Sequence, residues 1–159
     1  MVPGSNLIGV YLEIGKTRTF AGALDWPGWC RSGRDEAAAI KAGWRTFDSA
    51  VVAAKGKELR KGPRGGGREL DKIVRHLLES DAAYLARLGV RFKFAEGGDP
   101  QEELLRTRQA ILQALEAAAA GESPKEGPRG GIRWTPRRFV RRVAWHVLDH
   151  AWEIEDRIP

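Results

Sequence analysis

Three histidines are the residues of this 159-residue chain best suited to bind a transition metal. His146 and His150 stand four positions apart in a stretch with a helical pattern, and His76 lies in a second such stretch. Because a helix turns about 100° per residue, an i, i+4 pair projects from one face with its side chains one turn apart. A third imidazole from a facing helix would complete a three-histidine site with open positions for water or substrate. The sequence therefore predicts a divalent-metal site.

The same histidines also have a purely structural interpretation. In it, His146 and His150 pair with nearby carboxylates on a helix face and His76 is an unrelated core residue, or the three form a polar cluster without metal. For an isolated histidine, this would be the usual interpretation. The chain has only these three histidines, and the fact that none falls outside the pattern favours the metal site.

Two acidic residues accompany the histidines on the last helical stretch. Glu153 shares their face and could act as a fourth ligand, as an acceptor that orients an imidazole, or as a base for bound water. It could equally form an i, i+4 ion pair with Arg157. Asp149, three positions after His146, could serve the same roles or face solvent.

Four helical stretches, separated by segments rich in glycine and proline, must position these side chains. Their apolar residues recur at spacings of three and four, and Asp99-Pro100 and Thr135-Pro136 mark the starts of the last two. We expect helices over residues 36–54, 68–88, 101–120 and 136–157. The pattern predicts a mainly α-helical protein built as a four-helix bundle.

The depth of the histidines within their helices predicts the helix directions. At 1.5 Å per residue, His76 lies roughly 12 Å from the start of its helix, and the midpoint of His146 and His150 lies roughly 13 Å from the end of theirs. Facing histidines at equal depth favour antiparallel second and fourth helices. An up-down-down-up order follows, in which residues 89–100 cross the length of the bundle, since 12 extended residues reach about 40 Å.

The N-terminal part of the chain favours strands. Residues 7–14 and 18–24 are β-leaning, residues 15–17 between them suit a turn, and Pro27 and Gly28 then break the second strand. A short β-hairpin is therefore expected. Because a two-stranded ribbon is marginal alone, it must pack on the bundle or pair with another chain, and we predict a homodimer through such edges.

Composition excludes several classes of protein. Hydrophobic residues make up 42% and charged residues 30% of the chain, and no apolar run approaches the roughly 18 residues that span a bilayer. Cys30 is the only cysteine, so an internal disulfide is excluded and a reducing cytoplasm is expected; its thiol is either buried or reactive. A net charge of +6 is more typical of a solvated basic surface than of nucleic-acid binding. Neither nucleic acid nor a membrane is expected as a partner.

Part of this positive charge gathers on the first turns of the last helical stretch. The arginines there are Arg137, Arg138, Arg141 and Arg142. The start of a helix carries partial positive charge, so a local anion or an acidic partner would be favourable at this end. A solvated basic face is the alternative.

Two segments carry a family resemblance. The sequences RRVAWHVLDHAWEIEDR at 141–157 and ELRKGPRGGGRELDKIVRHLLESDAAYLARLG at 58–89 resemble the DinB-like superfamily, with a match over about 36–157. The resemblance implies a metal-binding four-helix bundle of up-down-down-up topology. It also implies that His76, His146 and His150 bind a divalent ion such as zinc, nickel, iron or manganese. Enzymes of this superfamily include thiol S-transferases that use low-molecular-weight thiols, thiol-dependent isomerases and hydrolases.

The N-terminal segment carries a second resemblance. VYLEIGKTRTFAGALDWPGWCRSGRDEAAAI at 10–40 resembles the opening ββα portion of a HicB-like antitoxin domain, truncated because no further strand is expected before the first helix. We therefore divide the chain into a HicB-like β-hairpin segment at 1–35 and a DinB-like bundle at 36–159. Two functions are expected: a metal-dependent enzyme that activates a thiol or water nucleophile for a small-molecule substrate, or a non-catalytic, antitoxin-like module that contacts nucleic acid or a partner protein.

Overall fold

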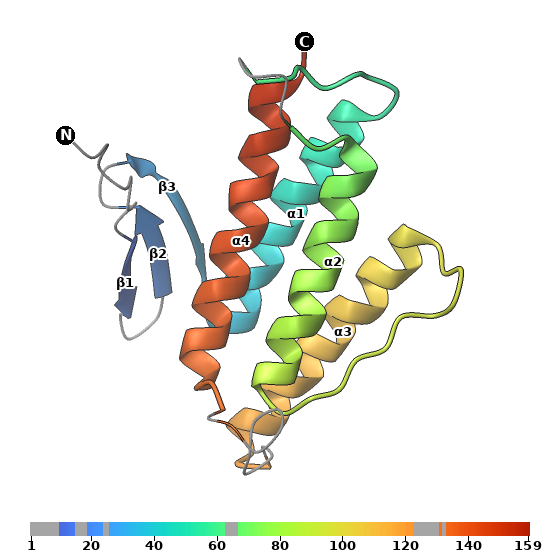
Figure 1. The fold of residues 1–159 in the computed structure, drawn as a ribbon. Helices are drawn as coiled ribbons and strands as arrows, with labels where there is room; N and C mark the ends of the chain where they lie inside the picture. Colours follow the sequence, from blue (N-terminus) through green and yellow to red (C-terminus); the bar gives the residue numbers. More distant parts are fainter. Residues whose placement is uncertain (1–9, 15–18, 24–25, 63–66, 123–130, 132) are drawn as a thin grey trace, which may run out of the picture.

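Four α-helices form most of the structure, which is a computed structural model (Figure 1). It describes the backbone of residues 10–14, 19–23, 26–62, 67–122, 131 and 133–159, and within these ranges the side chains from residue 34 onward except that of Glu36. The helices are α1 (Glu36–Ala54), α2 (Leu70–Arg87), α3 (Pro100–Ala119) and α4 (Pro136–Arg157). The prediction of a mainly α-helical chain with four helices is confirmed, and each helix begins and ends within two residues of its expected range.

The helices follow the up-down-down-up order (Figure 1). After α2, an irregular connection returns along the bundle, so that α3 starts near the beginning of α2 and runs in the same direction. Contacts at both ends of the two helices show that α2 and α4 are antiparallel. The Trp134 N–H, just before α4, donates to the carbonyl of Arg87 at the end of α2 over 2.8 Å. At the other end, Gly67 lies against Arg157 in the last turn of α4.

Local sequence signals account for where three of the four helices begin. The Asp35 carboxylate accepts a hydrogen bond of 2.7 Å from Ala38 N at the start of α1. Asp99 and Thr135 cap α3 and α4 in the same way, and each is followed by a proline, which has no N–H that would need a partner in the first turn.

Gly43 interrupts the apolar pattern of α1 because α4 approaches closely there: a Cβ at this position would lie 3.0 Å from Val147 Cγ1.

The apolar faces of all four helices meet in one core. Its largest fully buried side chains include Phe47 of α1, Ile73 of α2, Ile111 of α3 and Phe139 of α4. Burial of each such side chain contributes about 1.5–3 kcal/mol to folding relative to its exposed state, and this burial holds α2 against α4.

No helix in the described part of the chain is long and apolar enough to cross a membrane.

Beside the bundle lies an antiparallel sheet of three strands, one more than the sequence predicted (Figure 1). The strands are β1 (Val10–Ile14), β2 (Thr19–Ala23) and β3 (Trp26–Gly33), in the order β1-β2-β3. The third strand packs against α1. The expected turn at 15–17 lies outside the described residues.

The expectation that Pro27 and Gly28 end the strand region was wrong for a physical reason. Gly22 and Ala23 are neighbours in β2, yet their partners in β3 are Cys30 and Trp26, so the register shifts between them. A bulge of this kind takes up the residues around Pro27 without breaking the strand. A proline is tolerated in an edge strand, where its missing N–H need not remove a ladder hydrogen bond. The strand for which no room was expected therefore precedes α1.

Candidate metal centre

The three histidines meet between α2 and α4. One ligand nitrogen from each of His76, His146 and His150 lies within 4.8 Å of the others. The ring centroids are 4.6 Å apart for His146 and His150, and 5.2 Å and 5.1 Å from His76 to these two rings. The structure thus brings together the three residues that the sequence singled out, and they could bind a metal ion.

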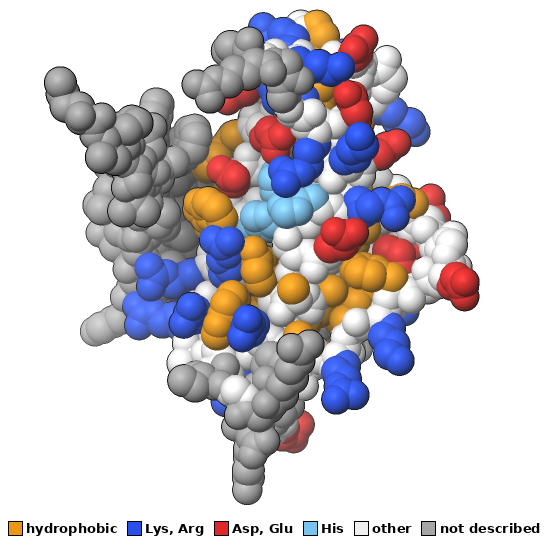
Figure 2. Space-filling model, viewed as in Figure 1, with side chains coloured by type: hydrophobic (Ala, Val, Ile, Leu, Met, Phe, Trp, Pro, Cys, Tyr) orange, Lys and Arg blue, Asp and Glu red, His pale blue; other side chains and the backbone are white. Residues whose placement is uncertain are grey.

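The cluster is buried on one side and open on the other. His146 and His150 are only 5% and 4% exposed, whereas His76 is half-buried. Figure 2 shows histidine side chains reaching the surface of one face, bordered by basic, acidic and hydrophobic side chains. A ligand could therefore approach the histidines from this face.

The geometry of the α4 pair fits a shared ion. The Nε2 atoms of His146 and His150 are 3.1 Å apart. Two nitrogens that bind one zinc ion at 2.0–2.1 Å in tetrahedral geometry are separated by roughly 3.3 Å. The two atoms could thus face one ion with little rearrangement.

Glu153 orients His150 and is itself held by an arginine. One carboxylate oxygen, Oε2, lies 2.7 Å from His150 Nδ1. The other, Oε1, accepts a hydrogen bond of 3.0 Å from Arg157 Nη1. A proton on His150 Nδ1 leaves the lone pair of Nε2 directed at the cluster. Two alternatives of the sequence analysis, an orienting acceptor and an i, i+4 ion pair, therefore occur together.

Glu153 is not among the grouped ligand atoms, and neither is Asp149, which is half-buried. Both oxygens of Glu153 are already engaged, so a role as fourth ligand or as base would require one of these contacts to break. The described residues therefore supply three nitrogen ligands and no carboxylate ligand.

Arg157 links this hydrogen-bonded chain to the segment that follows α1. Its Nε donates to the carbonyl of Arg60 over 2.7 Å, and the Arg60 N–H donates to the Arg157 carbonyl over 2.8 Å. The Arg60 side chain also donates to the carbonyl of Asp156 over 2.6 Å. The end of α4, and with it Glu153, is thus fixed to another part of the backbone.

Burial lowers the pKa of two of the histidines, His146 and His76. Desolvation, followed by the nearby His150, His76, Arg142 and Arg68, lowers the pKa of His146 to about 3. The pKa of His76 is also lowered, first by burial and then by Arg68 and His150, against the opposing effect of Glu79 and Glu153. Neutral imidazole is the form that binds metals.

Aromatic rings and an arginine border the cluster on the side of His146. The rings of Tyr84 and Trp145 lie 5.7 Å and 6.0 Å from that of His146, and Trp134 lies 5.7 Å from Tyr84. Arg142 Nε donates to the Tyr84 hydroxyl over 3.0 Å. The sequence analysis missed Tyr84 and Trp134. Tyr84 follows His76 by two helical turns, and this spacing was the signal that could have revealed it.

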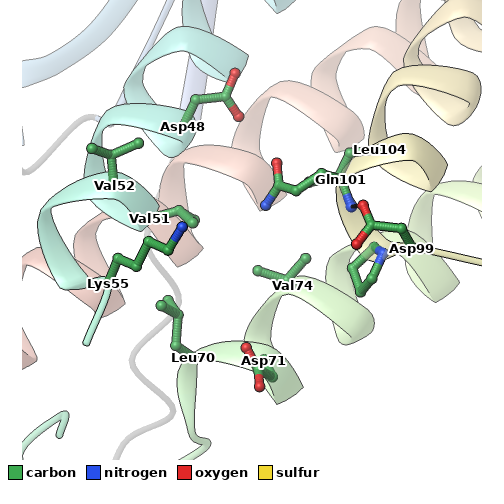
Figure 3. Close-up of a pocket in the computed structure, with 11 residues that line it drawn as sticks. Asp48, Val51, Val52, Lys55, Leu70, Asp71, Val74, Asp99, Gln101 and Leu104 are labelled. Carbon is green, nitrogen blue, oxygen red and sulfur yellow. Dashed lines mark hydrogen bonds between the residues drawn. The ribbon is translucent and has the colours of Figure 1, made fainter. Parts of the chain in front are cut away.

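A separate hollow of about 600 Å³ lies between α1 and the first turns of α2 and α3 (Figure 3). Its lining includes no histidine. Of its three acidic residues, Asp48 forms a two-pronged ion pair with Arg108 at 2.6 Å and 2.9 Å, Asp99 caps α3, and Asp71 is exposed in the first turn of α2. Because it has no histidine and two of its three carboxylates already have partners, the hollow is a weaker candidate for a site than the histidine cluster.

Comparison with known proteins adds no relative: no family model, no curated protein and no solved structure matches the chain. The DinB-like and HicB-like resemblances therefore stay predictions. So does the role of Cys30, whose side chain lies outside those that the structure describes.

Proposed function

We propose that this protein is a DinB-like, metal-dependent enzyme in which His76, His146 and His150 hold a divalent ion. The observation that carries the proposal is the convergence of three nitrogen ligands within 4.8 Å on a face open to solvent. Zinc, nickel, iron and manganese are the candidate ions, and zinc and nickel suit an all-imidazole set best. Such an ion, when bound, lowers the pKa of a coordinated water or thiol, so that a nucleophile exists at neutral pH.

The residues of the chain have distinct tasks in this proposal. His150 carries its proton on Nδ1, which donates a hydrogen bond to Glu153. His146 stays neutral because its pKa is about 3. Three neutral ligands leave the full positive charge of the ion available to polarise the nucleophile. The half-buried His76 marks the side from which a small-molecule substrate would enter.

Two reactions fit such a nucleophile. Transfer of a low-molecular-weight thiol is the first, because the family resemblance suggests it, and hydrolysis is the second. We also propose a cytoplasmic homodimer. The single cysteine of the sequence supports the cytoplasmic location. The two edge strands of the sheet, β1 and β3, support the homodimer, because either could pair with a second copy.

Metal analysis by plasma mass spectrometry, on protein purified without a histidine tag, tests the proposal. About one ion per chain is expected in the parent, and none in the His146→Ala, His150→Ala double variant. Asp149→Ala is a matched control on the same helix, outside the ligand group. Circular dichroism would verify that each variant folds. Metal-free parent protein, even after reconstitution, would overturn the proposal; a loaded parent would go on to thiol-transfer and hydrolase assays.

The alternative function is a non-catalytic module that contacts nucleic acid. The observation in its favour is the exposed row of arginines near the start of α4: Arg137, Arg138, Arg141 and Arg142. Contacts with phosphate weaken steeply as salt rises, so a tight complex at low salt that dissolves at higher salt would support it. Absence of any complex at low salt would exclude it.

A further inference from the structure

Arg142 occupies a fixed place beside the histidine cluster. It precedes His146 by four residues, so Arg142, His146 and His150 form one row along α4, with neighbours about one turn apart. On the facing helix, Tyr84 follows His76 by two turns. Because α2 and α4 are antiparallel, Tyr84 lies opposite Arg142, with its hydroxyl 3.0 Å from Arg142 Nε.

Aromatic contacts hold the guanidinium of Arg142 in this place. Its central carbon lies 4.5 Å from the centroid of the Trp145 ring and 5.4 Å from that of the Tyr84 ring. Two aromatic contacts and one hydrogen bond restrict a side chain that would otherwise move freely in solvent. An arginine that is already ordered loses less entropy when it binds a ligand.

This fixed positive charge has no carboxylate partner among the described residues. Its Nε donates to Tyr84, and the structure records no bond from its two terminal nitrogens to any described residue. Arg68, two residues before α2, adds a second positive charge, since both arginines lower the pKa of His146. Two arginines thus act on His146, whereas Glu79 of α2 and Glu153 of α4 bring negative charge near His76.

We infer that Arg142 binds an anionic group, a carboxylate or a phosphate, on the small-molecule substrate. Guanidinium donors recognise such groups through charge-assisted, often paired hydrogen bonds. The inference rests on the proposed function for the place of the reaction, which is at the histidines. Because Arg142 and His146 are one helical turn apart, the anionic group would lie close to the reacting atom. The substrate would then be compact and acidic.

Two matched probes test this inference: 3-mercaptopropionate, and its neutral amide, 3-mercaptopropionamide. Each would be titrated by calorimetry into zinc-loaded protein and into metal-free protein. The parent should prefer the carboxylate by about tenfold or more. Arg142→Gln should remove most of this preference, whereas Arg141→Gln, an exposed neighbour on the same helix, should retain it.

A second variant addresses the positioning of the guanidinium. Tyr84→Phe keeps the ring beside Arg142 and removes only the hydroxyl that accepts its hydrogen bond. An intermediate preference is expected, with zinc content unchanged. Thermal unfolding of each variant would show that the fold is retained.

The outcomes separate the inference from the proposed function. Failure of the protein to bind zinc would overturn the proposed function, and the titration of metal-free protein would still test the anion site. Zinc binding with equal affinity for both probes would overturn the inference and leave the metal centre standing. A preference that survives Arg142→Gln, or no binding of either probe at millimolar concentration, would likewise overturn it.

Discussion

His150 Nδ1 lies 2.7 Å from Glu153 Oε2, so the imidazole that faces the cluster is oriented by a carboxylate one turn further along the same helix. That carboxylate is held in turn by Arg157, and Arg157 is held by the Arg60 carbonyl. The position of a candidate ligand thus depends on a backbone carbonyl far away in the sequence.

Replacement of Glu153 by glutamine should weaken metal binding about 10-fold to 100-fold. The amide keeps the shape of the side chain but removes the negative charge that holds the proton on His150 Nδ1. Competition with a chromophoric zinc chelator would measure the change. Glu155→Gln, at an exposed position two residues further on, is the control. Equal affinities for the two variants would contradict the orienting role.

Replacement of Gly67 by alanine should weaken metal binding through Arg157. Gly67 has a φ of +132°, and a Cβ there would lie 2.6 Å from Arg157 Nη2, so the guanidinium must shift, and its Nη1 is the donor to Glu153. Gly56→Ala is a matched control: its φ is +76°, but nothing lies within 4 Å of the added carbon. Both variants should lose about 1 kcal/mol of stability from backbone strain. Only Gly67→Ala should also lose zinc affinity, and an equal loss in both would refute this link.

Asp81 should make the protein less stable as pH rises from about 4 to about 7. This side chain is only 2% exposed, and burial raises its pKa from 3.8 to about 7, with an opposing effect from Arg108. Between these values the folded state binds more protons than the unfolded state, so the stability present below pH 3.8 is lost as pH rises through the folded pKa.

The matching variant is Asp81→Asn, which cannot ionise. It should raise the free energy of unfolding at neutral pH, by an amount on the order of 4 kcal/mol at most, and have little effect below pH 4. Urea unfolding of metal-free protein across this range would measure it. Asp71→Asn, exposed on the same helix, should show no such gain. A variant that is less stable than the parent at neutral pH would refute the prediction.

His146 should have the opposite effect on the metal-free protein. Its pKa falls from 6.5 to about 3 in the folded state, so the unfolded state binds more protons between these values. The stability present above pH 6.5 is therefore lost as pH falls toward 3. His146→Gln should flatten this acid limb in the same urea experiment. Parallel pH curves for parent and variant would show that His146 is not the group responsible.

The helices and the meeting of the histidines could be predicted because their signals are local. Periodicity of apolar residues, together with the Asp35, Asp99 and Thr135 caps, sets where each helix lies. The depth of the histidines then favoured an antiparallel arrangement of α2 and α4. No pairing between distant strands had to be known for either step.

The features that were missed depend on how elements meet. Whether residues 26–33 form a strand depends on the pairing with β2 and on a bulge that accommodates Pro27. The linear sequence pattern reveals neither of these. The contact between Arg142 and Tyr84 depends on the rotation of α4 against α2. Asp81 was also missed. Its spacing from Leu77 and Leu85 places it on the buried face of α2, but its residue type argued against a core position, because few carboxylates are buried without a partner.

The histidines belong to two helices that are separated in the chain by the whole of α3, which contributes no ligand. The cluster thus exists only after the chain has closed a long loop and α4 has docked on α2. A partly folded chain with all four helices formed but not docked would offer only the His146 and His150 pair. Occupancy of the site would consequently report on tertiary closure rather than on helix content, and an ion bound there would act as a clasp between the second helix and the last.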